Sequence, residues 1–181
     1  DLGAEALLLL ELNSQTMVYA KNIDTRREPA SLTKVMTCLL ALEHGNLTDS
    51  ITVSQNSLDD LDPAGSSSGL MAGEVFTLEQ LLYCLLVVSA NEVSNILAEA
   101  VSGSVTAFVA LMNQRAQELG CENTHFVNTS GLPDNEHYTT AWDIYLFTRE
   151  AMKYDEFMTI VNTKAYDVPA TNKSEARELH S

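Results

Sequence analysis

Hydrophobic and polar positions along the chain first predict a pair of strands and then a long buried helix. Residues 4–12 are apolar, residues 13–15 are typical of a turn, and residues 16–20 form a second extended run, which together predict a β-hairpin. A helix is predicted to open at Pro29 and to end at Gly45, since glycine commonly follows the last turn of a helix. Apolar side chains surround this helix almost completely, so it is expected to be buried.

The next part of the chain predicts a block of helices behind a loop. Residues 49–73 are rich in Ser, Asp and Gly and predict a loop with one short helix near 57–61. Thr77 and Gln80 form a capping box, which marks the start of a helix. Further caps are expected at Ser104 and Thr140, and a strand is expected at 166–168. The predicted helices of this block cover residues 78–88, 92–101, 105–119, 141–154 and 156–161.

The order of these elements predicts an α+β fold, an antiparallel sheet with a large helical insert. One domain is expected over residues 1–181. Within it, residues 1–30 are predicted to form the hairpin and its lead-in, residues 31–154 a mostly helical region, and residues 155–181 the start of a return to the sheet.

The overall charge and the cysteines narrow the classes of function. A formal net charge of −15 argues against a nucleic-acid partner and against docking on anionic lipid, since both need a basic surface. No stretch is long and apolar enough to span a bilayer. Cys38 and Cys84 lie in apolar helical runs and are expected to be buried free thiols rather than part of a disulfide framework.

Ser31 and Lys34 form the first candidate for chemistry. Positions three apart lie on one face of a helix, so the hydroxyl and the ammonium can meet. A serine hydroxyl becomes a good nucleophile when a base takes its proton, and a lysine can be that base when desolvation lowers its pKa. The alternative is that Ser31 is a helix cap and Lys34 a surface residue whose stem lies on apolar neighbours.

Ser89 and Asn91 form the second candidate, because they interrupt an apolar helical run with two short polar side chains. A hydroxyl at this break can relay a proton, and an amide can bind a substrate carbonyl or steady the lysine. The alternative is a junction of two helices that is capped by one of the two residues.

Together, the two motifs in this order resemble those of β-lactamases and penicillin-binding proteins. The chain is similar over nearly all its length to D-alanyl-D-alanine carboxypeptidases of the low-molecular-mass penicillin-binding type. The stretches that carry the resemblance are residues 28–37, 85–95, 108–119, 124–128 with Gly131-Leu132, and 137–141.

The resemblance implies a role for each candidate residue. Ser31 would attack a peptide that ends in D-Ala-D-Ala, and Lys34 would be the general base. Ser89 would relay the proton to the leaving amine, and Asn91 would bind the substrate backbone. The implied partners are peptidoglycan stem peptides and β-lactams, the implied location is extracytoplasmic at the bacterial cell wall, and neither a cofactor nor a metal is implied.

One part of the family's pattern is not found in this sequence. The family carries a third motif, Lys-Thr-Gly or a close variant, on a strand beyond the helical insert, and neither 164–166 nor 173–175 matches it. The later strands of the sheet are also expected to be missing, and two strands alone are marginally stable. A further segment of the protein or a second chain is therefore expected to complete the sheet.

Two other functions remain open at this stage. A class A-like β-lactamase needs a glutamate that positions the deacylating water, and residues 122–137 contain no Glu-x-x-Leu-Asn run. A non-catalytic domain that senses penicillin or peptidoglycan is the other alternative. A zinc site at Cys121, His125 and His137 is not expected, since their spacing matches no standard pattern.

Overall fold

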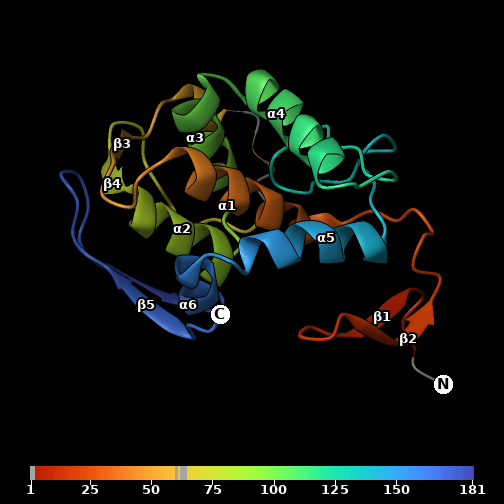
Figure 1. Cartoon of the computed structure of the whole chain (residues 1–181). Helices are drawn as coiled ribbons and strands as arrows, with labels where there is room; N and C mark the ends of the chain where they lie inside the picture. The colour runs from red at the N-terminus through yellow and green to blue at the C-terminus, as the bar shows by residue number, and fades with distance from the viewer. Residues whose placement is uncertain (1–2, 60, 62–64) are drawn as a thin grey trace.

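A block of helices forms the centre of the molecule in this computed structural model, which describes residues 3–59, 61 and 65–181 (Figure 1). Three two-stranded antiparallel sheets, β1–β2, β3–β4 and β5–β6, lie around the helices in the described part of the chain. The predicted α+β class is confirmed. The elements are β1 (Leu7–Glu11), β2 (Thr16–Lys21), the 3-10 helix η1 (Ala30–Leu32), α1 (Thr33–His44), β3 (Ser50–Thr52), the 3-10 helix η2 (Asn56–Leu58), β4 (Val75–Thr77), α2 (Leu78–Val87), α3 (Asn91–Ser102), α4 (Val105–Glu118), α5 (Ala141–Ala151), α6 (Asp155–Val161), β5 (Ala165–Val168) and β6 (Arg177–His180).

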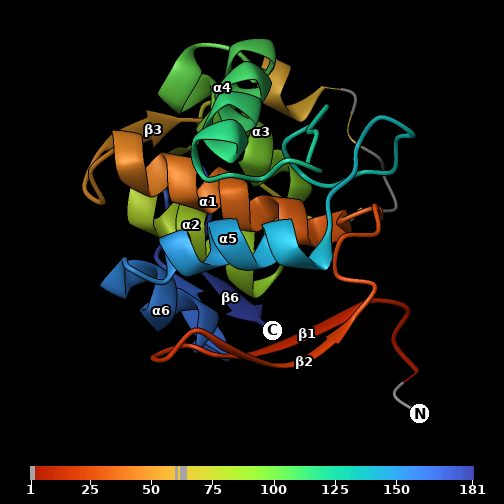
Figure 2. The same cartoon turned by 45° about the vertical axis from the view of Figure 1, so that its right-hand side comes forward.

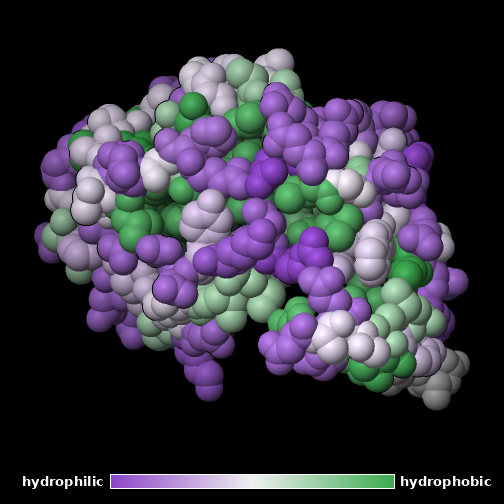
Figure 3. All heavy atoms as spheres, in the orientation of Figure 1, coloured by the Kyte–Doolittle hydropathy of each residue, from purple (hydrophilic) through white to green (hydrophobic). Residues whose placement is uncertain are grey.

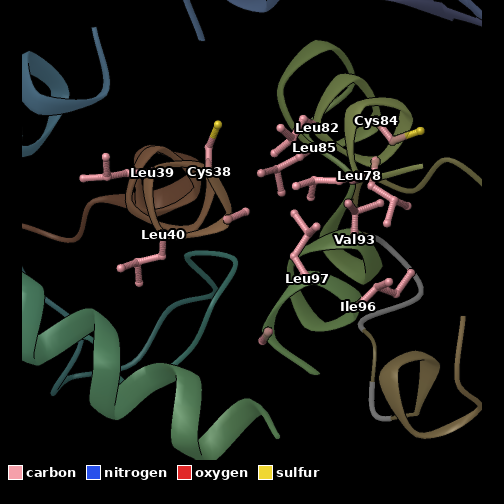
Figure 4. Packing of buried hydrophobic residues seen from close by; sticks show 14 of the residues in the cluster. Cys38, Leu39, Leu40, Leu78, Leu82, Cys84, Leu85, Val93, Ile96 and Leu97 are labelled. Atoms are coloured by element: carbon pink, nitrogen blue, oxygen red, sulfur yellow. The ribbon is translucent and has the colours of Figure 1, made fainter. Parts of the chain in front are cut away.

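Helix α1 is the centre of the core, as its apolar sequence predicts. It packs against α2, α3, α4 and α5, which surround it in both views of the chain (Figures 1 and 2). Leu82 and Leu85 of α2 point towards α1, and Leu97 of α3 lies below them on the same side of α1 (Figure 4). Cys38 and Cys84 are buried free thiols, as predicted. The core therefore holds the start of α1 rigidly, with its first turn at the edge of the helical block.

The predicted hairpin is present and stands apart from the helices. Strands β1 and β2 pair antiparallel, with Leu7 opposite Lys21. Leu9 is 54% exposed and Val18 is 62% exposed, and hydrophobic side chains gather on the hairpin surface in Figure 3. A hollow of about 460 Å³ lies between β1 and α5 and is lined mainly by apolar side chains. The hairpin thus adds little to the core that holds the helices.

Local signals place the ends of most helices within a residue of the prediction. The Thr77 hydroxyl accepts from the Gln80 N–H at 3.2 Å, and the Gln80 side chain accepts from the Thr77 N–H at 2.9 Å, so the capping box is confirmed. Ser104 and Thr140 also cap their helices. Gly45 follows α1 in an extended conformation rather than a left-handed one; a Cβ there would meet Leu78 Cδ2 at 2.7 Å.

Some boundaries differ from the prediction. The α-helix predicted from Pro29 begins at Thr33, because residues 30–32 form a separate 3-10 turn. Residues 49–73 are not only loop, because β3 lies within them and pairs with β4. Strand β4 was not predicted, since its last residue, Thr77, is also the cap of α2. The helix predicted to Tyr154 ends at Ala151. Residue 60 of the helix predicted at 57–61 lies outside the described residues, and η2 covers Asn56–Leu58.

A helix that spans a bilayer must be both long and apolar. Over the part of the chain that the structure describes, no single helix has both the length and the apolar character of a bilayer span. Among the described helices, α3 and α4 meet those two criteria when they are taken together, and they are bent by 84° at their junction.

Candidate active site

The four predicted site residues lie together at the start of α1. Lys34 Nζ is 3.2 Å from Ser31 Oγ and 2.8 Å from Asn91 Oδ1. The Ser89 hydroxyl donates to Ser31 Oγ at 3.0 Å. Two segments almost sixty positions apart in the chain therefore meet through their side chains, and none of the four hydrogen-bonds as a helix cap.

Ser31 is exposed to solvent, as a nucleophile must be. It lies in η1, just before α1, at the edge of a hollow of about 390 Å³ that Leu86 and Ser89 also line. Ala30 has a φ of +48°, which is uncommon for a residue with a side chain. The backbone around Ser31 is thus set by a local turn and not by the regular geometry of the helix that follows.

Lys34 is only 2% exposed, although it carries an amine. Its Nζ also donates to the Ser130 carbonyl at 2.8 Å, which gives the ammonium three acceptors for its three hydrogens. Burial lowers the pKa of Lys34 to about 8, and the Glu92 carboxylate acts in the opposite direction. A neutral amine at the same place can keep its bonds to Asn91 and Ser130 and direct its lone pair at the Ser31 hydroxyl.

The junction between α2 and α3 presents Ser89 and Asn91 to this lysine. Ser89 has a φ of +59°, in the left-handed region, and the residue that precedes α3 is Ala90, which makes no side-chain cap. Asn91 is the first residue of α3, and its amide oxygen faces Lys34. The break in the apolar helical run therefore directs both polar side chains towards Ser31 and Lys34.

A loop on the other side of α1 closes the back of the site. Thr33 Oγ1 lies 2.8 Å from His137 Nε2, and the Val127 N–H donates to His137 Nδ1 at 3.0 Å. Since Nδ1 accepts, Nε2 carries the hydrogen and donates to Thr33, so this imidazole is neutral. Burial lowers the pKa of His137 to about 4. His137 thus anchors the loop that brings the Ser130 carbonyl to Lys34.

Three contributors to the site were not recognised in the sequence. The Ser130 carbonyl is a backbone group, which any residue type could supply. His137 lies in the stretch 137–141 that carries the resemblance and was weighed as a zinc ligand, but no role in the site was predicted for it. The described residues contain no cluster of three or more ligand side chains. Glu92 is 1% exposed and acts on Lys34 through its charge. A charged residue directly after Asn91, in the first turn of α3, was the available signal.

Comparison with known proteins gives the family. The model of the D-alanyl-D-alanine carboxypeptidase family matches residues 1–178. The D-alanyl-D-alanine carboxypeptidase DacF of Bacillus subtilis is 35% identical over 165 residues, which are 88% of this chain and 42% of that protein. The DacA carboxypeptidase of Escherichia coli K12 is 34% identical and aligns with 81% of this chain and 38% of its own length.

The solved structures agree with the fold. A mutant of the Streptomyces K15 DD-transpeptidase superposes with a TM-score of 0.89 at 31% identity, over 97% of this chain and 72% of that one. The chain belongs to the D-alanyl-D-alanine carboxypeptidase family, and the resemblance inferred from its motifs is confirmed. It spans less than half the length of the DacF and DacA relatives, 42% and 38% respectively.

Proposed function

We propose that this chain carries the nucleophile and the base of a serine-type D-Ala-D-Ala carboxypeptidase, which removes the terminal D-alanine from peptidoglycan stem peptides. The convergence of Ser31, Lys34, Ser89 and Asn91 in one hydrogen-bonded cluster is the observation that carries this proposal. Family membership supports the substrate class, since relatives that align with most of this chain carry that name.

The geometry supports a reaction in two steps. Neutral Lys34 takes the proton of the Ser31 hydroxyl, and Oγ attacks the carbonyl carbon between the two D-alanines. The C–N bond then breaks. Ser89 gives its proton to the leaving amine and receives the proton that Lys34 had taken. Free D-alanine leaves and an ester on Ser31 remains. In the second step water attacks this ester, and a proton returns to Ser31 Oγ through the same groups.

Asn91 and the backbone would hold the substrate during both steps. The Asn91 amide has an oxygen on Lys34 and an N–H₂ group that can donate to a peptide carbonyl of the substrate. The N–H of Ser31 would be one donor to the oxyanion that forms during attack, because it lies on the same residue as the nucleophile. Ser31 is thus the nucleophile that becomes acylated, and Lys34 is the general base. Ser89 relays the proton, and Asn91 binds the substrate.

Partners and location follow from the same proposal. A β-lactam amide would acylate Ser31 in place of the peptide bond, and its adduct would block the site. We expect the reaction outside the cytoplasmic membrane, at the cell wall, since that is where peptidoglycan is assembled. The division of the chain into residues 1–30, 31–154 and 155–181, and the completion of the sheet by another segment or chain, stay predictions.

A labelled penicillin tests the proposal on the intact protein. We expect a covalent adduct on Ser31 and its loss in Ser31→Ala, because alanine has no hydroxyl to acylate. Because Ser31 is exposed, the free energy of unfolding should change by only about 0.5 kcal/mol. Ser102→Ala, at the far end of α3, is the matched control and should label normally.

The outcomes separate the alternatives. Release of D-alanine from a D-Ala-D-Ala peptide, together with a lasting penicillin adduct, supports the carboxypeptidase. Rapid turnover of penicillin would instead indicate a β-lactamase. Penicillin binding that survives Ser31→Ala would indicate a non-catalytic sensing domain and would contradict the proposal.

A further inference from the structure

Glu92 is a buried acidic residue beside the site, and the mechanism above does not use it. It is 1% exposed in the first turn of α3, directly after Asn91. Burying a carboxylate is costly unless polar partners compensate. One oxygen, Oε1, accepts from the Ser67 hydroxyl at 2.8 Å and from the Ser68 N–H at 2.7 Å. The other, Oε2, is buried without a hydrogen-bond partner, so packing and bonding alone do not account for a carboxylate here.

The two bonds of Oε1 hold one particular loop, residues 66–69. The Ser66 carbonyl accepts from the Asn91 N–H at 2.9 Å, so the loop is tied to two successive residues of α3. The Gly69 carbonyl accepts from Arg177 at 3.2 Å, which fixes the other end of the loop. Ser66 and Ser67 remain exposed. This loop therefore presents polar, exposed groups next to Asn91, the residue proposed to bind the substrate backbone.

The charge of Glu92 also acts on Lys34. The groups that hydrogen-bond Lys34 Nζ from α3, from η1 and from the loop behind α1 are all neutral: the Asn91 amide, the Ser31 hydroxyl and the Ser130 carbonyl. Within the described residues, Glu92 is the charged side chain that raises the pKa of this lysine against the effect of burial. The same carboxylate thus accepts hydrogen bonds from the loop and raises the pKa of Lys34.

We propose that Glu92 is a positioning residue with two effects: it ties the loop 66–69 to α3 beside Asn91, and its charge acts on Lys34. One carboxylate thus holds the loop that would contact the substrate peptide and tunes the base that activates Ser31. This inference rests on the proposed function for the identity of the substrate, a D-Ala-D-Ala peptide. The arrangement of Glu92, the loop and Lys34 does not depend on that identity.

Two variants separate the two effects in the intact protein. Glu92→Gln keeps an oxygen that can accept from the loop and removes the charge. We expect the midpoint of the Lys34 titration, followed by NMR of its side chain, to fall by about 0.5–1 pH unit, and the pH profile of penicillin acylation to shift with it. Ser67→Ala keeps the charge and removes one bond to the loop. It should leave the Lys34 midpoint unchanged, speed hydrogen exchange at the Ser68 amide by about 3–10-fold, and raise KM for the peptide more than it lowers kcat.

Glu99→Gln is the matched control. Glu99 also lies on α3, and its carboxylate likewise holds a loop, through Ser54 and Asn56. Its loss should change neither the Lys34 midpoint nor exchange at Ser68. An unchanged Lys34 midpoint in Glu92→Gln would overturn the inference. Unchanged hydrogen exchange at Ser68 and an unchanged KM in Ser67→Ala would also overturn it, and this second test remains decisive if Glu92→Gln does not fold. Titration and exchange need no substrate, so a wild-type protein that forms no penicillin adduct would defeat the proposed function alone.

Discussion

At the scale of single residues, the environment of Lys34 decides when the site can work. An ammonium cannot accept the proton of Ser31, and burial lowers the pKa of Lys34 to about 8. We therefore expect the acylation rate with penicillin to rise about tenfold per pH unit below pH 8 and to level off above it. Stopped-flow or gel-based rates from pH 6 to 9 measure this rise.

Arginine at the same position gives the control for this profile. Lys34→Arg keeps a positive charge that no accessible pH removes. It should acylate slowly, without a rise towards pH 8. A wild-type rate that is flat from pH 6 to 9 would contradict the role of Lys34 as the base.

His137 makes the fold sensitive to acid. Burial lowers its pKa from 6.5 to about 4, with Asp134 acting in the opposite direction, so the folded state binds a proton less readily than the unfolded state. Its contribution is complete above about pH 6.5 and is lost as the pH falls towards 4. We expect urea unfolding to show a falling free energy of unfolding across this window.

The matching variants test which histidine is responsible. His137→Asn should remove most of this acid dependence and cost roughly 1–3 kcal/mol at pH 7, because the buried Thr33 hydroxyl and the half-buried Val127 N–H lose their partner. His44→Asn, in the last turn of α1, should keep the dependence. Equal acid sensitivity in wild type and His137→Asn would show that another group causes it.

Residue chemistry also shows how far sequence reasoning reaches. Ser31, Lys34, Ser89 and Asn91 were predicted because their side-chain types and spacings carry the chemistry themselves. The acceptor at Ser130 was not, since a backbone carbonyl is the same for every residue type. Glu92 was not either, because its effect on Lys34 depends on its burial in the folded protein, where α3 packs on α1.

At the scale of elements, caps are the signals that the structure follows most closely. Thr77 closes a complete capping box at the start of α2. Thr77→Ala should lower the free energy of unfolding by about 1 kcal/mol in thermal or urea denaturation. Thr159→Ala is the control, because this exposed threonine lies inside α6, where its hydroxyl bonds a carbonyl of the preceding turn. An equal loss in both variants would show that the cap has no special effect.

The short strands were hard to predict for a physical reason. Strands β3 and β4 have three residues each, too few for an alternating pattern to stand out, and β4 ends at the residue that caps α2. Strand β6 was missed because its sequence, RELH, mixes charged residues with one leucine. Its pairing with β5 stabilises it, and such a contact between distant residues leaves little local signal.

At the scale of the whole molecule, the nucleophile and the loop behind α1 meet with almost no space between them. Gly131 has a φ of +92°, and a Cβ there would lie 1.8 Å from the Ala30 carbonyl oxygen. Backbone on both sides leaves little freedom to move. Gly131→Ala should therefore displace the Ser31 turn, lower the free energy of unfolding by about 3 kcal/mol or more, and slow acylation strongly.

Gly103→Ala separates this effect from backbone strain. Gly103 also has a positive φ, +76°, but no atom lies within 4 Å of a Cβ built there. This variant should cost only about 1 kcal/mol and leave acylation unchanged. If both variants behaved alike in thermal unfolding and penicillin labelling, the close approach of Gly131 to Ala30 would not affect stability or acylation beyond the cost of backbone strain.

The left-handed backbone of Ser89 sets two selective pressures against each other. Glycine adopts a φ of +59° without strain, whereas a residue with a side chain loses about 1 kcal/mol there. Selection for folding alone would favour glycine at position 89, and selection for proton transfer would retain the hydroxyl. Laboratory evolution towards heat resistance, without a demand for turnover, is therefore expected to erase the relay early and to yield a sturdier but inert protein.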